Sequence, residues 1–265
     1  MNGSTFRLNR YSVVMFLLIF FGVFLCAAEI IIAESELPFA PGEKLTFQLK
    51  WGFIPAGEAV LEVQPIKNIN GIKAYHFVLT AKSNSFVDIF YKVRDRIDAY
   101  ADLNMTHTLL YNKQQHEGNT KRNVTVNFDW EKNTAQYINF GLKNKPISIM
   151  PGSFDPLSAF YYTRLVDLKE NAVITSPVTD GKKCVVGKAK IVKREKIKLA
   201  SGIYDTYLME PELKHIGGVF KKSKNAKIQL WVSADKRRSP LKIKSKVVVG
   251  SFVGELISAE GTGNP

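Results

Sequence analysis

Apolar and polar residues alternate along most of the chain after residue 40. In the segment KLTFQLKW the even positions are polar and the odd positions are apolar, namely Leu45, Phe47, Leu49 and Trp51. This period of two is typical of a half-buried antiparallel strand. The segment GEAVLEV follows the turn region Pro55–Gly57 and places Leu61 on an apolar face. The two segments therefore predict a β-hairpin.

Five further segments show the same short alternation and are separated by Asn, Gly or charged turns. They are AYHFVLTAK, IDAYADL, HTLLYNKQQ, NVTVNFDW and TAQYINF. Neither a Pro/Ser-rich linker nor a low-complexity tract divides residues 34–265. We therefore expect one mostly β domain over 34–265, built as a single curved antiparallel sheet or an open half-barrel.

One segment departs from the alternating pattern. In FDPLSAFYYTRLVDL, Asp155 is a natural N-cap and Pro156 suits the first helical position. Apolar residues then recur at spacings of three and four, among them Phe160 and Tyr161. The sequence predicts one helix over about 155–167 that packs on the sheet.

Two distant segments share an order of features. In IDAYADLNMTHTLLYNK and in IQLWVSADKRRSPLKIKSK, an alternating strand with an aromatic residue (Tyr100 or Trp231) leads to a turn with an aspartate (Asp102 or Asp235) and then to a second apolar strand. The match needs an offset of one residue. It allows the sheet to consist of two related β modules.

The N-terminus resembles an export segment. The first ten residues contain Arg7 and Arg10 but no acid, and an apolar stretch runs from residue 11 to residue 28. A secretory signal peptide has this arrangement, with cleavage after Ala28 or after Ala33. Alternatively, residues 11–33 stay in place as a membrane anchor, because the run is long enough to span a bilayer. Residues 34–265 are expected in the periplasm, either free or anchored in the inner membrane.

Cysteine usage limits the chemistry of the domain. Cys26 falls in the export segment, which leaves Cys184 as the one cysteine of residues 34–265. A disulfide within the domain and a cysteine metal cluster are therefore excluded. In KKCVVGKAKIV this cysteine alternates with apolar neighbours, so we interpret it as a small buried hydrophobic residue of a strand.

Positive charge is concentrated in the second half of the chain. Residues 34–142 contain 12 Lys and Arg against 12 Asp and Glu, whereas residues 143–265 contain 23 against 11, a net charge of 23 − 11 = +12. On an exported protein this excess suits anionic lipid headgroups, lipopolysaccharide phosphates or acidic glycans, and nucleic acid is not an expected partner. Solvated strand faces that discourage aggregation are the alternative. The cations that alternate with apolar residues, and so are candidates for an anion-binding face, are Lys188, Lys190, Arg194, Lys196, Lys242, Lys244 and Lys246.

Motifs of catalysis are missing from the sequence. It contains no HExxH, GxSxG, P-loop or GxGxxG. Its four histidines are too widely spaced for a compact metal site. In YKVRDRIDAYAD, Asp95, Asp98 and Asp102 accompany Arg94 and Arg96, and we expect these charges to pair with one another instead of acting as general acid and base. We expect no catalytic residue, no metal and no cofactor.

Several segments together resemble a known family. They are PFAPGEKLTFQLKWGFIPAGEAVLEV, VRDRIDAYAD, FDPLSAFYYTRL, ASGIYDTYLMEP and IQLWVSADKRRSPLKIKSKVVVGSFVGELI. In this order, over about residues 38–260, they are similar to the bacterial family catalogued as domain of unknown function 3108 (DUF3108). The resemblance implies an exported protein of a diderm bacterium, without an assigned reaction or functional residues. The segment LWVSADKRRSPLKI is also similar to the lipoprotein-sorting carriers of the periplasm, which are open β half-barrels that hold acyl chains.

Three hypotheses of function follow. The preferred one is a non-catalytic carrier whose sheet and helix shelter an acyl chain or a similar lipid-like ligand. Its groove candidates are Phe47, Leu49, Trp51, Leu61, Phe160 and Tyr161. The alternative is a structural or assembly factor of the envelope that docks on a polymer or a protein through its basic face. The third is an envelope glycan hydrolase, which needs two carboxylates about 5–10 Å apart across a cleft.

Overall fold

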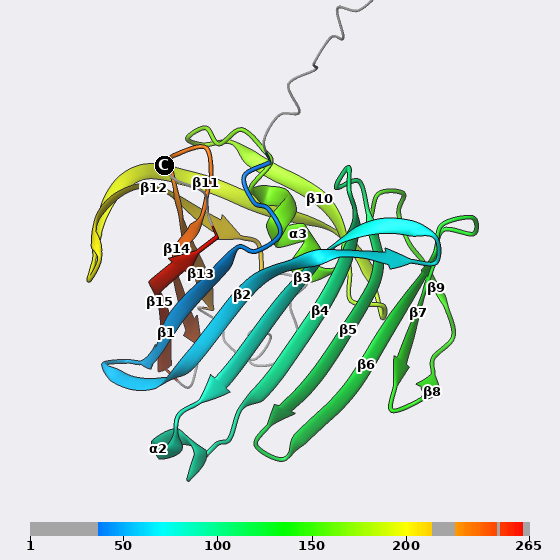
Figure 1. Cartoon of the computed structure of the whole chain (residues 1–265), viewed down its shortest axis with the longest axis horizontal. Coiled ribbons are helices and arrows are strands. Elements are labelled where there is room, and N and C mark those ends of the chain that lie inside the picture. Colours follow the sequence, from blue (N-terminus) through cyan, green and yellow to red (C-terminus); the bar gives the residue numbers. More distant parts are fainter. Residues whose placement is uncertain (1–36, 214–225, 248–249, 262–265) are drawn as a thin grey trace, which may run out of the picture. The chain divides into compact units, whose positions relative to one another are not determined.

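The computed structural model describes residues 37–213, 226–247 and 250–261, and residues 1–33 and His215 lie outside them. The described chain forms one open antiparallel sheet in which strands adjacent in sequence are mostly adjacent in space (Figure 1). The main exception lies at its centre, where β1 (Lys44–Trp51) pairs with β15 (Gly250–Glu260). The expected mostly β fold with one curved sheet and a helix is confirmed.

The central pair β1–β15 divides the sheet into two arms. The N-terminal arm consists of β2 (Ile54–Ile69), β3 (Ile72–Ser83), β4 (Arg94–Asp102), β5 (Thr108–Glu117), β6 (Thr120–Asp129), β7 (Thr134–Asn139), β8 (Leu142–Lys143) and β9 (Ile147–Ser148). The C-terminal arm consists of β10 (Val173–Thr179), β11 (Cys184–Leu199), β12 (Gly202–Pro211), β13 (Lys227–Ser233) and β14 (Pro240–Val247).

In β1 and the N-terminal arm, the alternation seen in the sequence places large side chains opposite small ones. Phe47 of β1 faces Ala59 of β2, and Phe77 of β3 faces Ala99 of β4. Phe47 and Phe77 are buried. A ring beside a methyl group fills the space above two strands without overlap, which is how interiors reach crystal-like density. The hairpin expected from the first two segments is confirmed as β1–β2.

Two short helices complete the described chain, α2 (Ser85–Asp88) between β3 and β4, and α3 (Pro156–Thr163) before β10. The carboxylate of Asp155 caps α3 by accepting hydrogen bonds from the N–H groups of Leu157 (2.8 Å) and Ser158 (3.1 Å). The helix ends four residues before the expected end at residue 167. Its last N–H groups bond three residues back, from Arg164 to Tyr161 and from Leu165 to Tyr162, and this tighter turn terminates the helix.

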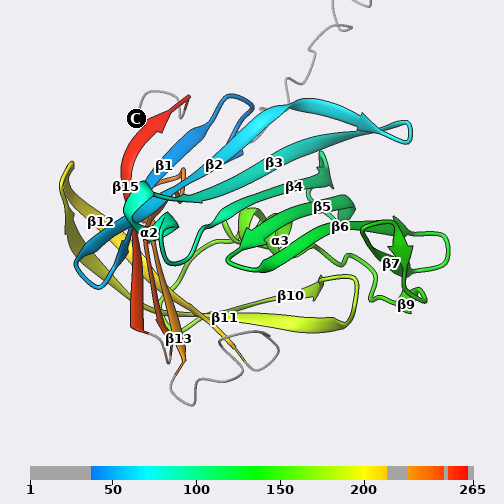
Figure 2. The same ribbon diagram turned by 90° about the horizontal axis from the view of Figure 1, so that it is seen from below.

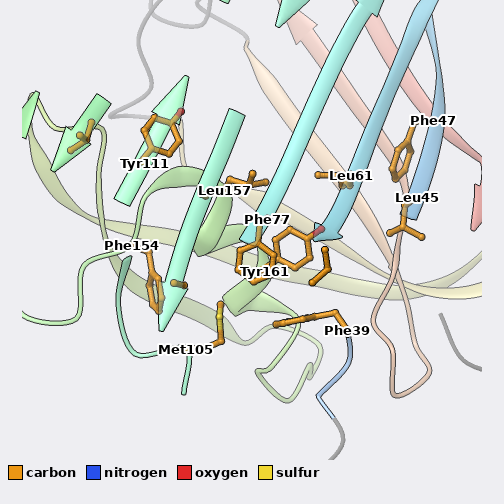
Figure 3. Packing of buried hydrophobic residues seen from close by; sticks show 14 of the residues in the cluster. Phe39, Leu45, Phe47, Leu61, Phe77, Met105, Tyr111, Phe154, Leu157 and Tyr161 are labelled. Carbon is orange, nitrogen blue, oxygen red and sulfur yellow. The ribbon is translucent and has the colours of Figure 1, made fainter. Parts of the chain in front are cut away.

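The helix lies between the two arms, as the view from below shows (Figure 2). On the side of the N-terminal arm its ring of Tyr161 stacks on Phe77, with the ring centroids 3.9 Å apart. Phe39, from the segment before β1, meets both rings edge-on at 5.2 and 5.4 Å (Figure 3). Tyr161 and Phe77 have no exposed surface. This side of the helix is therefore packed solid.

The two segments that share an order of features both fold as hairpins, β4–β5 and β13–β14. In the first, Asp102 accepts hydrogen bonds from the N–H groups of Thr106 and His107. In the second, Asp235 accepts them from the N–H groups of Arg237 and Arg238. In both hairpins, one in each arm, an aspartate carboxylate therefore stabilises the turn by accepting hydrogen bonds from backbone N–H groups. Among the described residues no helix has the length and apolar character needed to cross a bilayer.

Candidate functional site: a groove between the helix and the C-terminal arm

An apolar groove of about 500 Å³ lies on the other side of α3. Its helical wall is formed by Pro156, Ala159, Phe160 and Thr163. Its opposite wall is formed by apolar residues of β10–β14, namely Ile174, Val178, Val185, Ala189, Met209, Pro211, Ile228, Leu230 and Ile243. Cavities of a few hundred Å³ with apolar walls are typical of sites for small organic ligands.

The strand wall of the groove is built from small and medium-sized side chains. On β10 and β11 the groove face pairs Ile174 with Ala189 and Val178 with Val185. Between these pairs stands Gly187, where an added Cβ would approach the Cγ2 atom of Val178 to 3.1 Å. The wall contains no aromatic residue to match the rings on the far side of α3. The groove is open because this wall is built from aliphatic and small residues.

Both ends of the helix are fixed, which keeps the groove from collapsing. Before α3, the N–H of Phe154 donates to Pro177 and the N–H of Thr179 donates to Phe154, at 2.9 and 2.8 Å. Thr108 of β5 donates through its hydroxyl to the carboxylate of Asp155 at 2.7 Å. The start of the helix is therefore tied to β10 and to β5.

The end of the helix is held by a buried ion pair. The guanidinium of Arg164 donates to both carboxylate oxygens of Glu43, at 2.6 and 2.8 Å, and both side chains are almost fully buried. Arg164 also donates to the carbonyl of Arg237 (3.0 Å), and the guanidinium of Arg238 donates to the carbonyl of Arg164 (2.9 Å). These contacts join the helix to the segment before β1 and to the β13–β14 turn. A bidentate pair of this kind fixes orientation as well as distance.

Three charged residues, Asp180, Lys183 and Glu212, line the rim of the groove, and Lys188 borders it although its side chain alternates to the other face of β11. Asp180 accepts hydrogen bonds from the N–H groups of Lys182 and Lys183, at 2.9 and 3.1 Å, and so closes the β10–β11 turn. Glu212 donates its N–H to the carbonyl of Lys188 at 2.8 Å. The rim of the groove is therefore polar, whereas its interior is almost entirely apolar.

The six groove candidates from the sequence are not brought together. Phe160 lines the groove. Phe47, Leu61 and Tyr161 belong to the buried core of the other side. Leu49 lies beside Ile243 of the groove wall, since a Cβ on Gly254 would meet both side chains. Trp51 is 49% exposed and stacks on Phe252 at 6.4 Å, at the end of β1.

The cationic candidates divide between the two faces of the sheet. Lys190, Glu210, Gln229 and Lys244 form one row across β11–β14, through cross-strand pairing and the hydrogen bond from Gln229 to Glu210. Lys188 and Lys246 share this face by alternation along their strands, and Lys246 stands opposite Lys227. Lys242 is also on it and pairs with Glu255 at 2.8 Å.

A bulge moves the remaining two cations to the other face. The register of β11 shifts between Ile191 and Lys193, so Arg194 faces Tyr207 and Lys196 faces Asp205. Tyr207 and Asp205 lie on the opposite side of β12 from Glu210, the partner of Lys190. Arg194 pairs with Asp205 at 2.5 Å, and its hydrogen bonds lower the pKa of that carboxyl. Even spacing in sequence therefore does not give one continuous basic face.

The acidic cluster of β4 is divided as well. Asp98 accepts hydrogen bonds from Arg96 (2.7 and 2.8 Å) and from His76 (2.8 Å). Burial alone would raise the pKa of Asp98, but these hydrogen bonds keep it below its ordinary value. Asp95 lies on the other face. Burial and the nearby carboxyl of Glu117 raise the pKa of Asp95 to about 6. Among the described residues no three His, Cys, Asp or Glu side chains are placed to hold a metal ion.

Cys184 is half-buried and contacts the hydroxyl of Ser153 at 3.3 Å. The residues that sequence reasoning missed are the aliphatic side chains of β10, β12 and β13. Each lies in an ordinary alternating strand, and alternation does not show which strands line an open space beside a helix. The small residues Gly187 and Ala189 between Val185 and Ile191 were the available signal.

Comparison with known proteins places the chain by fold and by family. No curated protein matches its sequence. The crystal structure of a β-barrel-like protein of domain of unknown function DUF1849 from Brucella abortus matches with a TM-score of 0.51 and 8% identity, over 83% of this chain and 97% of that one. A hypothetical protein from Chlamydia trachomatis matches with a TM-score of 0.36 and 9% identity, over 85% of this chain and 90% of that one. The family model described as "Protein of unknown function (DUF3108)" matches residues 46–257, so the chain belongs to that family.

Proposed function

We propose that this protein is an exported carrier that binds an apolar, chain-like ligand, such as the acyl chain of a lipid, in the groove between α3 and the C-terminal arm. The observation that carries the proposal is the contrast between the two sides of the helix. One side is filled by Tyr161, Phe77 and Phe39, whereas the other leaves about 500 Å³ open above an aliphatic wall.

The chemistry of the groove suits such a ligand. Removing apolar surface from water stabilises a complex by roughly 25 cal/mol per Å². The aliphatic wall offers dispersion contacts and few hydrogen-bond partners, so it favours hydrocarbon over a polar molecule. The charged residues of the rim, among them Asp180 and Lys183, offer polar surroundings for the head of an amphipathic ligand. Because the helix is fixed at both ends, the ligand does not have to open the site.

Export through residues 1–33 belongs to the same proposal, because a carrier of acyl chains between envelope membranes works outside the cytoplasm. The positive and then apolar order of residues 1–28 supports it. Sequencing the N-terminus of the protein recovered from the periplasm would locate a cleavage site after Ala28 or Ala33, or show that residues 1–33 are retained.

Ligand binding is tested by native mass spectrometry of the protein purified from its membranes and by titration with a fluorescent fatty acid. We expect a co-purifying lipid and saturable binding. In Ser176→Phe a ring would occupy the groove next to Gly187, because Ser176 lines it, and binding is expected to fall at least about tenfold, or 1.4 kcal/mol. Thr175→Phe is the matched control, since Thr175 is exposed on the other face of β10. Binding that is absent in the wild type, or equal in the two variants, contradicts the proposal.

A second candidate function is docking of the protein on an anionic envelope polymer. It is favoured by the row of cations on the face opposite the groove, where Lys188, Lys190, Lys227, Lys244 and Lys246 outnumber Glu210. Lys244→Glu with Lys246→Glu is expected to abolish salt-sensitive association with lipopolysaccharide or peptidoglycan. Unchanged association would exclude this face, and the acyl-chain assay on the same variant would separate the two functions.

A further inference from the structure

Large apolar side chains gather, exposed, at one end of the sheet. They come from the β1–β2 turn and from the segment between β3 and β4. Phe53 is fully exposed, and the exposed fractions of Trp51, Phe86, Ile89, Phe90 and Tyr91 are 49, 55, 74, 76 and 51%. We call these six residues the aromatic end. Isolated exposed apolar residues are ordinary on a protein surface, but a cluster of this kind marks an interaction site.

Hydrogen bonds hold the two segments of the aromatic end together. The side-chain amide of Asn84 donates to the carbonyl of Pro55 at 2.7 Å, and the N–H of Asn84 donates to the carbonyl of Ala56 at 2.9 Å. Both ribbon views place α2 beside the β1–β2 turn (Figures 1 and 2). On the other side, the N–H of Gly52 donates to Ser251, and the ring of Trp51 stacks on Phe252. The central pair β1–β15 and the N-terminal arm therefore both contribute to this end.

The base beneath these side chains is well fixed. Asn84 caps α2 by accepting a hydrogen bond from the N–H of Val87 at 2.9 Å. The carboxylate of Asp88 in α2 accepts hydrogen bonds from the guanidinium of Arg94, at 2.6 and 3.1 Å, and from the hydroxyl of Ser83. None of the residues of α2 is buried, although the helix contains Phe86 and Val87. The segment between β3 and β4 is thus held in place by hydrogen bonds while its apolar side chains are exposed to solvent.

Cations accompany the aromatic side chains. Lys50, Lys82, Lys92 and Arg94 lie on or beside the segments of this end, and Lys246 of β14 faces Ser251 of β15; the nearby carboxylates are those of Glu58, Asp88 and Glu255. In the adjoining β5–β6 turn Glu117 is followed by Lys121 and Arg122. Aromatic rings that sit at the level of lipid headgroups, together with positive charge, are the usual means by which proteins attach to the surface of anionic membranes.

We infer that the aromatic end is a membrane-docking surface that inserts Phe53 and the side chains of the 86–91 segment into the interfacial layer of an anionic lipid bilayer. The six side chains project from the end of β1, the β1–β2 turn and the segment between β3 and β4, and all are exposed, so they can enter a fluid interface without a complementary pocket. This inference goes beyond the groove and does not depend on it. The surface would bring the protein to a membrane whether or not the groove holds a lipid.

Vesicle binding by the full-length protein, as recovered from the cell envelope, tests the inference. The vesicles contain either phosphatidylcholine alone or an equal mixture with phosphatidylglycerol, and partitioning is measured by flotation. We expect stronger partitioning on the anionic vesicles and a loss of about tenfold or more in Phe53→Ser with Phe90→Ser. Leu142→Ser with Ile203→Ser is the matched control, because these side chains are 77 and 71% exposed on β8 and β12.

A local reporter separates docking from insertion through residues 11–33, which all variants share. Trp51 stands within the aromatic end, whereas Trp130 and Trp231 donate hydrogen bonds to Thr108 and Glu195 elsewhere in the sheet. Lipids with brominated acyl chains are expected to quench the fluorescence of the wild type and much less that of Trp51→Phe. Equal quenching, or equal partitioning of the two double variants, overturns the inference.

Self-association and the groove variant Ser176→Phe give two further tests of the membrane-docking inference. If the wild type self-associates in sedimentation and Phe53→Ser with Phe90→Ser does not, while vesicles are ignored, the surface is an interface between copies and the membrane proposal fails. Ser176→Phe, which fills the groove, is expected to keep its vesicle binding. A carrier that fails to bind fatty acid but still floats with anionic vesicles would refute the proposed function alone.

Discussion

The two arms of the sheet use the same helix in opposite ways. Against the N-terminal arm, α3 packs Tyr161 on Phe77 with the ring centroids 3.9 Å apart. Against the C-terminal arm it holds Phe160 over aliphatic strands and leaves about 500 Å³ open. The difference follows from composition, because the first arm pairs rings with alanines, whereas the second opposes the helix with Val, Ile, Leu, Ala and Gly. One side of the helix is therefore filled, and the other leaves the open space that we propose as the ligand site.

The largest expected effect is a difference between truncations on the two sides of the helix. Phe77→Ala removes a fully buried ring and is expected to lower the free energy of unfolding by about 4 kcal/mol. Phe160→Ala removes a half-buried ring that already borders open space, and about 1 kcal/mol is expected. Urea unfolding followed by circular dichroism measures both. Similar losses for the two variants would mean that the groove side is packed as tightly as the other.

The next largest effect is expected at the buried ion pair between Arg164 and Glu43. Arg164→Met leaves the carboxylate of Glu43 buried without its partner, and a loss of about 3 kcal/mol in the free energy of unfolding is expected. Fatty-acid binding is expected to weaken as well, since the helix end loses its bonds to Arg237 and to the segment before β1.

The control for this ion pair is the double variant Glu43→Leu with Arg164→Met. It removes both charges and is expected to recover much of the stability, because no unpaired charge stays buried. If the double variant is as unstable as the sum of the two single variants, the pair is not coupled in the way that the geometry indicates.

The smallest expected effect distinguishes the arms by pH. Burial and Glu117 raise the pKa of Asp95 to about 6, above the value of about 3.8 that it has in an unfolded chain. The folded state therefore binds more protons between these values, so this contribution to stability is present below pH 4 and is lost as the pH rises through 6. With allowance for solvent screening, the loss is about 1 kcal/mol.

Amide hydrogen exchange measures this effect arm by arm. Protection of β4 and β5 is expected to fall between pH 5 and pH 7.5, after correction for the intrinsic exchange rate, whereas protection of β11 and β12 stays level. Asp95→Asn is expected to remove the dependence, since its amide oxygen still accepts the N–H of His116. A dependence that persists in the variant would assign the titration to another group.

Much of the fold could be predicted from single residues and their neighbours. The alternation in residues 44–63 predicted β1, β2 and their hairpin, and Asp155 with Pro156 marked the start of α3. The end of the helix was missed because the C-cap residue Arg164 is held through its side chain by Glu43, and position 43 is 121 residues away in sequence. No local pattern carries that contact.

The site was less accessible to sequence reasoning than the fold. The groove candidates on β1 and β2 are large residues, and large residues are what fill a core. The open space arises where β10–β14 offer side chains of medium size to a helix that is held from elsewhere. The basic face was predicted from even spacing along β11, and the bulge between Ile191 and Lys193 reverses the parity. Register shifts of this kind depend on the partner strand.

The pairing of β1 with β15 also bears on how the chain reaches its native state. Leu45 meets Ala259, so the centre of the sheet cannot close until almost the entire polypeptide is available, while each arm can assemble from neighbouring hairpins. Contacts between such distant positions slow folding, because closing the long loop costs conformational entropy before the strand pairing contributes any stabilisation. Since the end of β15 lies beside the start of β1, a circular permutant that joins them by a short linker would turn this seam into a local hairpin and should refold faster.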